Sequence, residues 1–316
     1  MGLASGKCML FGAWQTWATP LWMVAAGAVA AVVALYLVSY LVRIAAPKVA
    51  AIAQTTAKEA MAQPLFYLLL ALGVFAILLF PFLSYNTFGE DVKMLKAEGL
   101  TLIKILGIIL AVWTASVSIA DEIEGRTALT LLSKPVGRRQ FIVGKFLGVL
   151  VPVAVIFIVL SVFFLASVSF KVVYDARETS NPDPTIQDCR SEMGQIIPGL
   201  ALAFMETVML CAIGVAISTR LPMLPNLVIC ASIYVLGHLV PMLVQSAMGK
   251  FDLVKFMGRF LAAILPVLDH FSVEPAISAN QVVPLAYLGV AAVYCLLYTA
   301  VAMLLALLLF EDRDLA

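Results

Sequence analysis

A block of charged residues, Asp121 to Lys145, lies between two long apolar stretches of this chain. Its first acids include Glu122 and Glu124, and its bases include Arg138. Carboxylates and guanidinium groups of this kind form ion pairs and charge-assisted hydrogen bonds with other proteins. Because the flanking stretches have the composition of membrane spans, the block must lie in water. The sequence therefore predicts a site at which a soluble partner binds a membrane protein.

Two ionisable residues fall inside predicted spans, Glu206 near the middle of 196–218 and His238 near the middle of 223–245. Ionisable groups inside spans are functional candidates because they are costly to bury. Glu206 is a candidate to line a conduit or take a proton; the alternative is a protonated or paired carboxyl that holds two helices together. His238 is the weaker candidate, since a neighbouring carbonyl satisfies one imidazole. Lys104 lies near a span end and is expected to extend outward.

Neither metal chemistry nor covalent catalysis is predicted. The cysteines have no C-x-x-C or Cys/His ligand spacing, so we interpret them as small apolar residues of a helix bundle. With two histidines in total, no H-E-x-x-H and no G-x-S-x-G, an intramembrane protease would lack its machinery. The five cysteines are Cys8, Cys189, Cys211, Cys230 and Cys295.

The chain is not expected to hydrolyse ATP or to bind nucleic acid. A phosphate-binding loop reads G-x-x-x-x-G-K-[ST], whereas the nearest string here has Phe146 after Gly144-Lys145 and the wrong glycine spacing. The net charge is only +1, and no basic patch is interleaved with aromatic residues. We therefore predict that the protein is not an enzyme and needs no cofactor of its own.

Composition sets the fold class. The chain is 63% hydrophobic and 12% charged over 316 residues, against about 25% charged residues in soluble domains. A helix needs roughly 20 apolar residues to cross the hydrocarbon layer, and no alternating pattern of barrel strands occurs. The sequence predicts an all-α, polytopic transmembrane bundle with spans near 21–42, 65–84, 100–120, 147–170, 196–218, 223–245 and 284–310.

The orientation follows from lysine and arginine near the span ends, which favour the cytoplasmic side. The loop 121–145 is the richest, and 43–63 adds three more bases two spans away. Both loops are therefore predicted to be cytoplasmic, together with the C-terminus, while residues 85–99, 171–195 and 246–283 lie outside. The five bases of the loop are Arg126, Lys134, Arg138, Arg139 and Lys145.

Three other segments have distinct characters. Residues 48–63 are rich in alanine and predict an interfacial helix along the inner membrane surface. Residues 171–195 contain two prolines and several acids, which indicates an irregular extracytoplasmic loop. Residues 250–280 alternate charges with aromatic and aliphatic residues. That pattern favours a helix half-immersed in the outer interface, or a re-entrant pair broken at Pro266.

The local pattern of the loop 121–145 predicts a helix–turn–helix hairpin. Asp121, Glu122 and Glu124 are placed in the first turn of a new helix, where negative charge meets the positive end of the helix dipole. Pro135 ends that helix and residues 138–145 lead into the next span. A plain linker needs only about 2–8 residues, so a docking role is favoured over a solvated connection.

The loop resembles the signature region of permease subunits of ABC transporters of the type-2 exporter class. Their pattern runs, loosely, E-x-E-x-G-T-x-x-x-L-L-S-x-P-V-S-R-x-x-x-x-x-G-K. The tail LLLFEDRDL resembles the family's ending of an apolar span followed by F-x-x-R-D-L, and 48–66 resembles its N-terminal elbow helix. The matching positions in the loop are Glu122, Glu124, Thr127, Leu131, Leu132, Ser133, Pro135, Val136, Arg138, Gly144 and Lys145.

This resemblance implies a permease that dimerises, with itself or with a related chain, and is driven by a separate ATPase that binds the ATP. The loop 121–145 would be the coupling element. In that role Glu122 and Glu124 pair with basic residues of the ATPase, while Leu129 and Leu132 fill a hydrophobic groove. The other loop residues assigned to this contact are Arg126, Thr127, Ser133, Lys134, Pro135 and Arg138.

The implied organisation is a six-span permease domain over 48–316 preceded by an additional anchor in 1–47. The expected location is the cytoplasmic (inner) membrane, with lipid as the surrounding partner. Two alternatives remain: a non-transporting scaffold that recruits a cytoplasmic protein through the same loop, and a secondary transporter, for which only Glu206 offers an intramembrane charge.

Overall fold

The computed structural model describes residues 16–83, 91–124, 137–178, 184–247, 256, 260, 265–278, 281 and 283–311. All regular structure in these residues is helical, as the composition predicts. The helices are α2 (Leu21–Ala45), α3 (Pro47–Ala62), α4 (Pro64–Leu79), α5 (Asp91–Glu124), α7 (Arg138–Glu178), α8 (Ile186–Ser218), α9 (Met223–Ala247), α11 (Glu274–Ser278) and α12 (Leu285–Glu311), with 3-10 turns η1 (Phe80–Phe82) and η2 (Leu268–Phe271).

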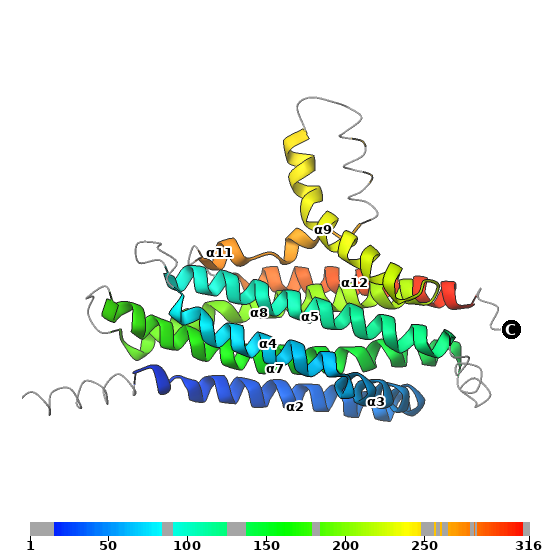
Figure 1. The fold of residues 1–316 in the computed structure, drawn as a ribbon, viewed down its shortest axis with the longest axis horizontal. Helices are drawn as coiled ribbons and strands as arrows, with labels where there is room; N and C mark the ends of the chain where they lie inside the picture. The colour runs from blue at the N-terminus through cyan, green and yellow to red at the C-terminus, as the bar shows by residue number, and fades with distance from the viewer. Residues whose placement is uncertain are drawn as a thin grey trace, which may run out of the picture.

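The long helices α2, α4, α5, α7, α8 and α12 lie side by side with their axes roughly parallel (Figure 1). The short helix α3 lies across the end of this bundle where α2 finishes and α7 begins. Helices α5, α7 and α8 contact one another and form its centre. Helix α2 lies at the edge, against α7 and α3.

Six helices among the described residues are long and apolar enough to cross a membrane. They correspond to six of the predicted spans, and the seventh coincides with α9, which is apolar over Met223–Leu239 among the described residues. The predicted fold class, an all-α polytopic bundle, is therefore confirmed. Backbone groups in lipid must be satisfied internally, which continuous helices of this length achieve.

Three helices extend further than hydropathy indicates. Helix α5 begins at Asp91 rather than near 100, α7 continues to Glu178, and α8 begins at Ile186. The prediction of an irregular segment over 171–195 is therefore wrong for 171–178 and 186–195, while residues 179–183 lie outside the described part of the chain. Thr185 and Asp188 form a capping box that starts α8. The sidedness of the segment remains a prediction.

Buried ion pairs explain why the helices continue past the apolar runs. Lys96 on α5 pairs with Glu192 on α8, and the Lys171 ammonium of α7 lies 3.3 Å from an Asp91 oxygen of α5. Both lysines are almost fully buried. A charge that has a partner inside the bundle does not have to end the helix.

The acidic start of the loop 121–145 is also placed differently from the prediction. Residues 121–124 form the last turn of α5, not the first turn of a new helix. No proline or glycine separates them from the span, so nothing in the sequence interrupts the helix before Gly125. Carboxylates at this position lie at the unfavourable end of the helix dipole.

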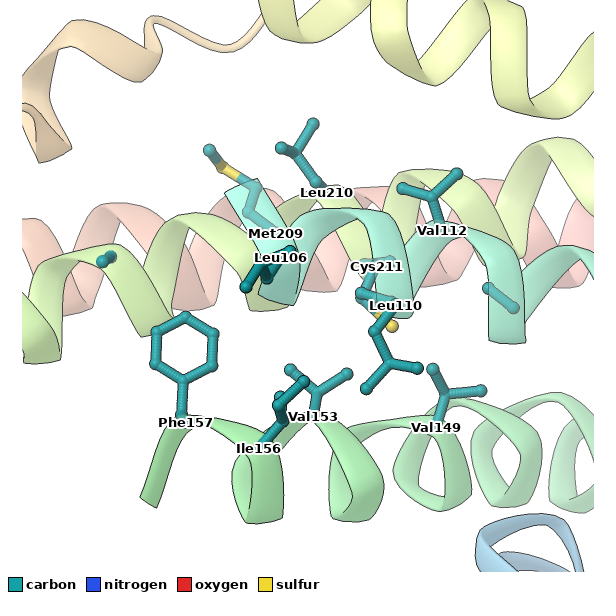
Figure 2. Packing of buried hydrophobic residues seen from close by; sticks show 14 of the residues in the cluster. Leu106, Leu110, Val112, Val149, Val153, Ile156, Phe157, Met209, Leu210 and Cys211 are labelled. Carbon is teal, nitrogen blue, oxygen red and sulfur yellow. The ribbon is translucent and has the colours of Figure 1, made fainter. Parts of the chain in front are cut away.

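The core is formed where α5, α7 and α8 meet. Figure 2 shows Leu106 and Leu110 of α5 facing Val153 and Ile156 of α7, with α8 completing the cluster through Cys211. Leu110, Val153, Ile156 and Cys211 are at most 1% exposed. Packing of this kind, rather than the hydrophobic effect, holds helices together in lipid.

Candidate functional site

The predicted site residues fall in two regions of the structure. One consists of the helix ends that flank the loop 121–145, and the other is a cluster of ionisable side chains inside the bundle. Glu122 and Glu124 lie in the last turn of α5, and Arg138 is the first residue of α7. Most of the loop lies outside the described residues, including the predicted contacts Arg126, Thr127, Leu129, Leu132, Ser133, Lys134 and Pro135.

The start of α7 is tied to the end of α12. The Arg138 guanidinium donates a hydrogen bond of 2.7 Å to the carbonyl oxygen of Glu311. One turn later the rings of Phe141 and Phe310 stack with their centroids 5.6 Å apart. Cations near the last carbonyls of a helix are favourable, so Arg138 also stabilises the end of α12.

Helix α3 is packed on the first turns of α7 through a G-x-x-x-G pair. A Cβ at Gly144 would come within 2.8 Å of Ile52, and one at Gly148 within 2.6 Å of Thr56. Only glycine allows this approach, which is the usual role of small residues at helix interfaces in membranes. The predicted elbow helix over 48–63 thus coincides with α3 to within one residue.

The C-terminal flank of the loop is therefore held from two sides, by α3 and by the end of α12. A displacement of the loop 121–145 would move α3 and α12 together with α7, because α7 contacts both of them. Rigid elements with dense contacts transmit displacement to the helices they touch. This arrangement is suited to passing motion from outside the membrane into the bundle.

The second region is centred on Lys104, which is only 4% exposed. The expectation that it extends outward is wrong. Its ammonium donates a 2.6 Å hydrogen bond to Glu274 on α11 and lies 3.7 Å from a Glu206 oxygen on α8. Pairing is the alternative to outward extension, because a buried ammonium needs an anion nearby.

Glu206 is fully buried and also faces His238 on α9, with 3.4 Å between Glu206 Oε1 and His238 Nε2. The other imidazole nitrogen, Nδ1, lies 3.0 Å from the carbonyl oxygen of Tyr234. A carbonyl only accepts hydrogen bonds, so Nδ1 carries a proton. A neutral ring would then present a lone pair to the carboxylate. No hydrogen bond joins Nε2 to Glu206, so the contact is a close approach of the two polar groups.

These contacts join four elements. Lys104 comes from α5, Glu206 from α8, His238 from α9 and Glu274 from α11. Glu206 lies about 18 Å along the helix axis from Ser218, the last residue of α8, which is deep within the span. The cluster brings together the two predicted candidates, Glu206 and His238, and supports the interpretation that Glu206 is a paired carboxyl holding helices together.

Further polar contacts lie along the boundary between α5 and α8. Besides pairing with Glu192, Lys96 donates a 3.1 Å hydrogen bond to Gln195. Toward the other end, the Asn226 amide donates to the Ser116 hydroxyl at 2.8 Å and to the Gly214 carbonyl at 3.0 Å. These partners and Glu274 are not among the residues that the sequence predicts. Their signal was the recurrence of opposite charges, Lys96 and Lys104 on one helix and Glu192 and Glu206 on another.

The segment that carries Glu274 is part of the bundle. Leu268, Phe271 and Ile277 are at most 2% exposed, and α11 contacts α5 and α8. The predicted outer interfacial or re-entrant segment 250–280 is described mainly over 265–278. In that part Asp269 and His270 are exposed, and the choice between a half-immersed helix and a re-entrant segment stays a prediction.

The family comparison decides what kind of membrane protein this is. The model of the ABC-2 family of transporter proteins matches residues 74–315, about three quarters of the chain. The chain belongs to the ABC-2 family. It is an ABC transporter permease, the membrane component of a transporter, and it crosses the membrane several times. Membrane components of this family work in general with an ABC ATPase.

The match places the two regions inside the family domain. The loop 121–145, the Lys104 cluster and the end of α12 all fall between residues 74 and 315. Helices α2 and α3 and the first part of α4 precede the matched residues. No curated protein sequence matches the chain at a significant level.

Proposed function

We propose that this ABC-2 permease is driven by a separate ATPase subunit and exports its substrate across a cytoplasmic (inner) membrane. The ATPase binds and hydrolyses ATP, and it docks on the loop 121–145 at the cytoplasmic face. The permease itself carries no catalytic residue. It acts as a dimer, with its C-terminus in the cytoplasm.

The contacts that hold the start of α7 against α3 and α12 are the observation that favours this proposal. A loop that only connects two spans needs no support, whereas here Arg138 and Phe141 contact the end of α12, and Gly144 and Gly148 fix α3. ATPase closure that displaces the loop would move α7 together with both partners. This is the mechanical property that coupling to an external motor requires.

Each end of the loop has its own role in the proposed contact. Glu122 and Glu124 extend α5 with carboxylates at its C-terminal end, where they pair with basic residues of the ATPase. The apolar pair Leu129 and Leu132 fills a hydrophobic groove on the ATPase, and Pro135 ends the contact. Arg126, Thr127, Ser133 and Lys134 supply the polar rim of the interface.

Inside the bundle, the Lys104 cluster links the helix that enters the loop to the helices behind it. Lys104 lies on α5, the helix that ends at Glu124, and its partners lie on α8, α9 and α11. A shift of α5 along its axis therefore acts on a buried set of charges. We infer that this cluster keeps the four elements moving as one body during transport.

The test is ATPase activity in lipid. The permease is co-purified with its ATPase and reconstituted into liposomes, and hydrolysis is compared for wild type and Leu132→Asp. We expect the substitution to abolish both ATPase association and the stimulation of hydrolysis by the permease, because it places a charge in the hydrophobic contact. The matched control is Leu285→Asp at the opposite end of the bundle, where Leu285 is 82% exposed.

The outcomes separate the proposal from its alternatives. Loss of stimulation in Leu132→Asp alone supports coupling through the loop. Stable association without any stimulation or transport would instead favour a scaffold. Substrate transport that continues without an ATPase would favour a secondary transporter.

A further inference from the structure

A large apolar groove lies between α2 and the rest of the bundle. The family match does not include its α2 wall. Its volume is about 540 Å³, within the range of about 300–1,000 Å³ for pockets that hold small molecules. It is an open groove rather than a closed cavity, and its walls come from α2, α7 and α8. Apart from the backbone, Ser161 and Arg190 supply its polar groups.

The groove exists because small residues on α2 face the bundle without closing on it. Gly27, Ala28, Ala31 and Ala34 lie on the lining face of α2, and small residues normally let helices approach closely. Here a Cβ added at Gly27 would meet no atom within 4 Å, and the same holds for Gly194 of α8. Only 6% of the most apolar stretch of the span that contains α2 is buried. The space must be filled by something other than this chain's described residues.

The dimensions fit one acyl chain. The lining residues of α2 run from Met23 to Val38, about 22 Å along a helix axis. The hydrocarbon core is about 30 Å thick, so one leaflet accounts for half of that and an acyl chain fits lengthwise. Because the groove opens at the edge of a bundle that lies in lipid, acyl chains are the apolar material in contact with its mouth.

A cation marks one end of the groove. Arg190 lies near the start of α8 and its Nε donates to the sulfur of Met23 at 3.0 Å. Among the described residues Arg190 forms no ion pair, since its neighbours Asp188 and Glu192 are engaged with Thr185 and Lys96. A guanidinium at the surface end of an apolar groove is complementary to a phosphate group.

We propose that this groove binds an anionic phospholipid, with one acyl chain between α2 and the α7–α8 pair and the phosphate on Arg190. The lipid fills the space between α2 and the permease domain and holds them together in place of direct helix packing. Arg190 lies near the start of α8, just after the end of α7, whereas the loop 121–145 leads into the start of α7, so the two lie at opposite ends of the bundle. Under the predicted orientation the lipid therefore comes from the outer leaflet of the membrane.

The experiment measures lipids retained by the full-length protein. The protein is reconstituted with equal amounts of phosphatidylglycerol and phosphatidylcholine, extracted in mild detergent and analysed by native mass spectrometry. Wild type is expected to retain one lipid per chain, with roughly a tenfold preference for phosphatidylglycerol, because the choline cation of phosphatidylcholine offsets the attraction of its phosphate to Arg190. Arg190→Gln should lose the preference and keep the lipid, whereas the control Arg177→Gln, exposed at the end of α7, should behave as wild type.

Filling the groove tests the acyl-chain part. Gly27→Leu, or Gly194→Leu if the first variant does not fold, should lower retention of both lipids several-fold. The control Gly289→Leu makes the same substitution on the exposed face of α12, where a Cβ also meets nothing within 4 Å.

Three results would overturn the proposal. The first is unchanged retention in both groove variants, and the second is an unchanged preference in Arg190→Gln. The third is efficient disulfide formation between two Ala31→Cys chains but not between two Val29→Cys chains, because that would assign the groove to a second copy of the protein.

Discussion

At the residue scale, the protein buries charges and gives each one a partner. Lys104 shows this most clearly, since it is held by Glu274 at 2.6 Å and by Glu206 at 3.7 Å. An unpaired charge in a membrane interior is strongly unfavourable, so the partners make the lysine tolerable. The same partners make its removal costly, because the buried Glu206 and the partly buried Glu274 would then lose their counter-charge.

Replacement of Lys104 should therefore destabilise the bundle more than its size suggests. We expect Lys104→Met to cost about 3–5 kcal/mol, the usual penalty for breaking a buried pair, measured by thermal unfolding in detergent. The control is Lys58→Met on the exposed face of α3. Adding Glu206→Gln and Glu274→Gln to Lys104→Met should restore part of the stability, and a triple variant less stable than Lys104→Met would contradict the pairing.

The position of Glu206 between Lys104 and His238 gives a second prediction at this scale. Glu206→Gln keeps a polar group beside His238 Nε2, and Lys104 keeps its hydrogen bond to Glu274, so its thermal stability should stay close to wild type. Glu206→Leu removes the polar group and should be clearly less stable, since a buried imidazole nitrogen then faces only apolar atoms. Equal losses for the two variants would show that the negative charge of Glu206 matters and its contact with His238 does not.

At the element scale, the contact of α3 with α7 depends on two glycines. Gly144 and Gly148 leave room for Ile52 and Thr56 on the facing helix. The contact begins at the end of the loop 121–145 and continues along the first turns of α7, so it connects α3 to whatever moves α7. Larger side chains would force the helices apart, and overpacking of this kind costs about 1–3 kcal/mol.

Gly148→Leu should therefore release α3 without unfolding the bundle. The expected result is faster proteolysis within 48–62 and a several-fold loss of ATPase stimulation in liposomes. Gly289→Leu serves as the control, since it adds the same side chain at an open position of α12. Full stimulation despite faster cleavage in Gly148→Leu would mean that α3 plays no part in coupling.

The predicted spans coincide with helices of the structure, but their predicted ends often do not, for one physical reason. Apolar runs identify spans because lipid selects composition, and Pro47 and Pro64 set the limits of α3 and α4. Hydropathy then ends a span at the first charge, whereas Lys96 and Lys171 continue inside their helices because partners on other helices neutralise them. Glu206 and His238 were found as isolated charges, but their contacts with Lys104 depend on tertiary packing that spacing alone does not specify.

At the scale of the whole molecule, the permease consists of a compact centre and a loosely attached first span. Helices α5, α7 and α8 supply most of the buried hydrophobic cluster, while α2 buries only Val24 within its bounds. The family match likewise starts at residue 74 and leaves α2 outside. The permease domain should therefore fold without this span.

Deletion of residues 1–45 tests this division. The shortened protein should remain monodisperse in detergent, with a melting temperature within a few degrees of wild type, and it should retain ATPase stimulation, because α2 contributes little buried surface. It should also lose the phospholipid bound at Arg190, since one wall of the groove is gone. Aggregation of the shortened protein, with normal behaviour of the full-length chain, would show that α2 belongs to the folded core.

The proposed mechanism requires that a motor in the cytoplasm reaches the loop 121–145. The side of the membrane on which this loop lies is therefore the most direct test. Ser133→Cys is introduced into a protein whose Cys8 is replaced by serine, and it is labelled with a membrane-impermeant maleimide in right-side-out and inverted vesicles. Thr185→Cys, before α8, reports on the opposite side. We predict labelling of Ser133→Cys only in inverted vesicles and of Thr185→Cys only in right-side-out vesicles, whereas labelling of Ser133→Cys from the outside would place the loop beyond the reach of any ATPase and contradict the account.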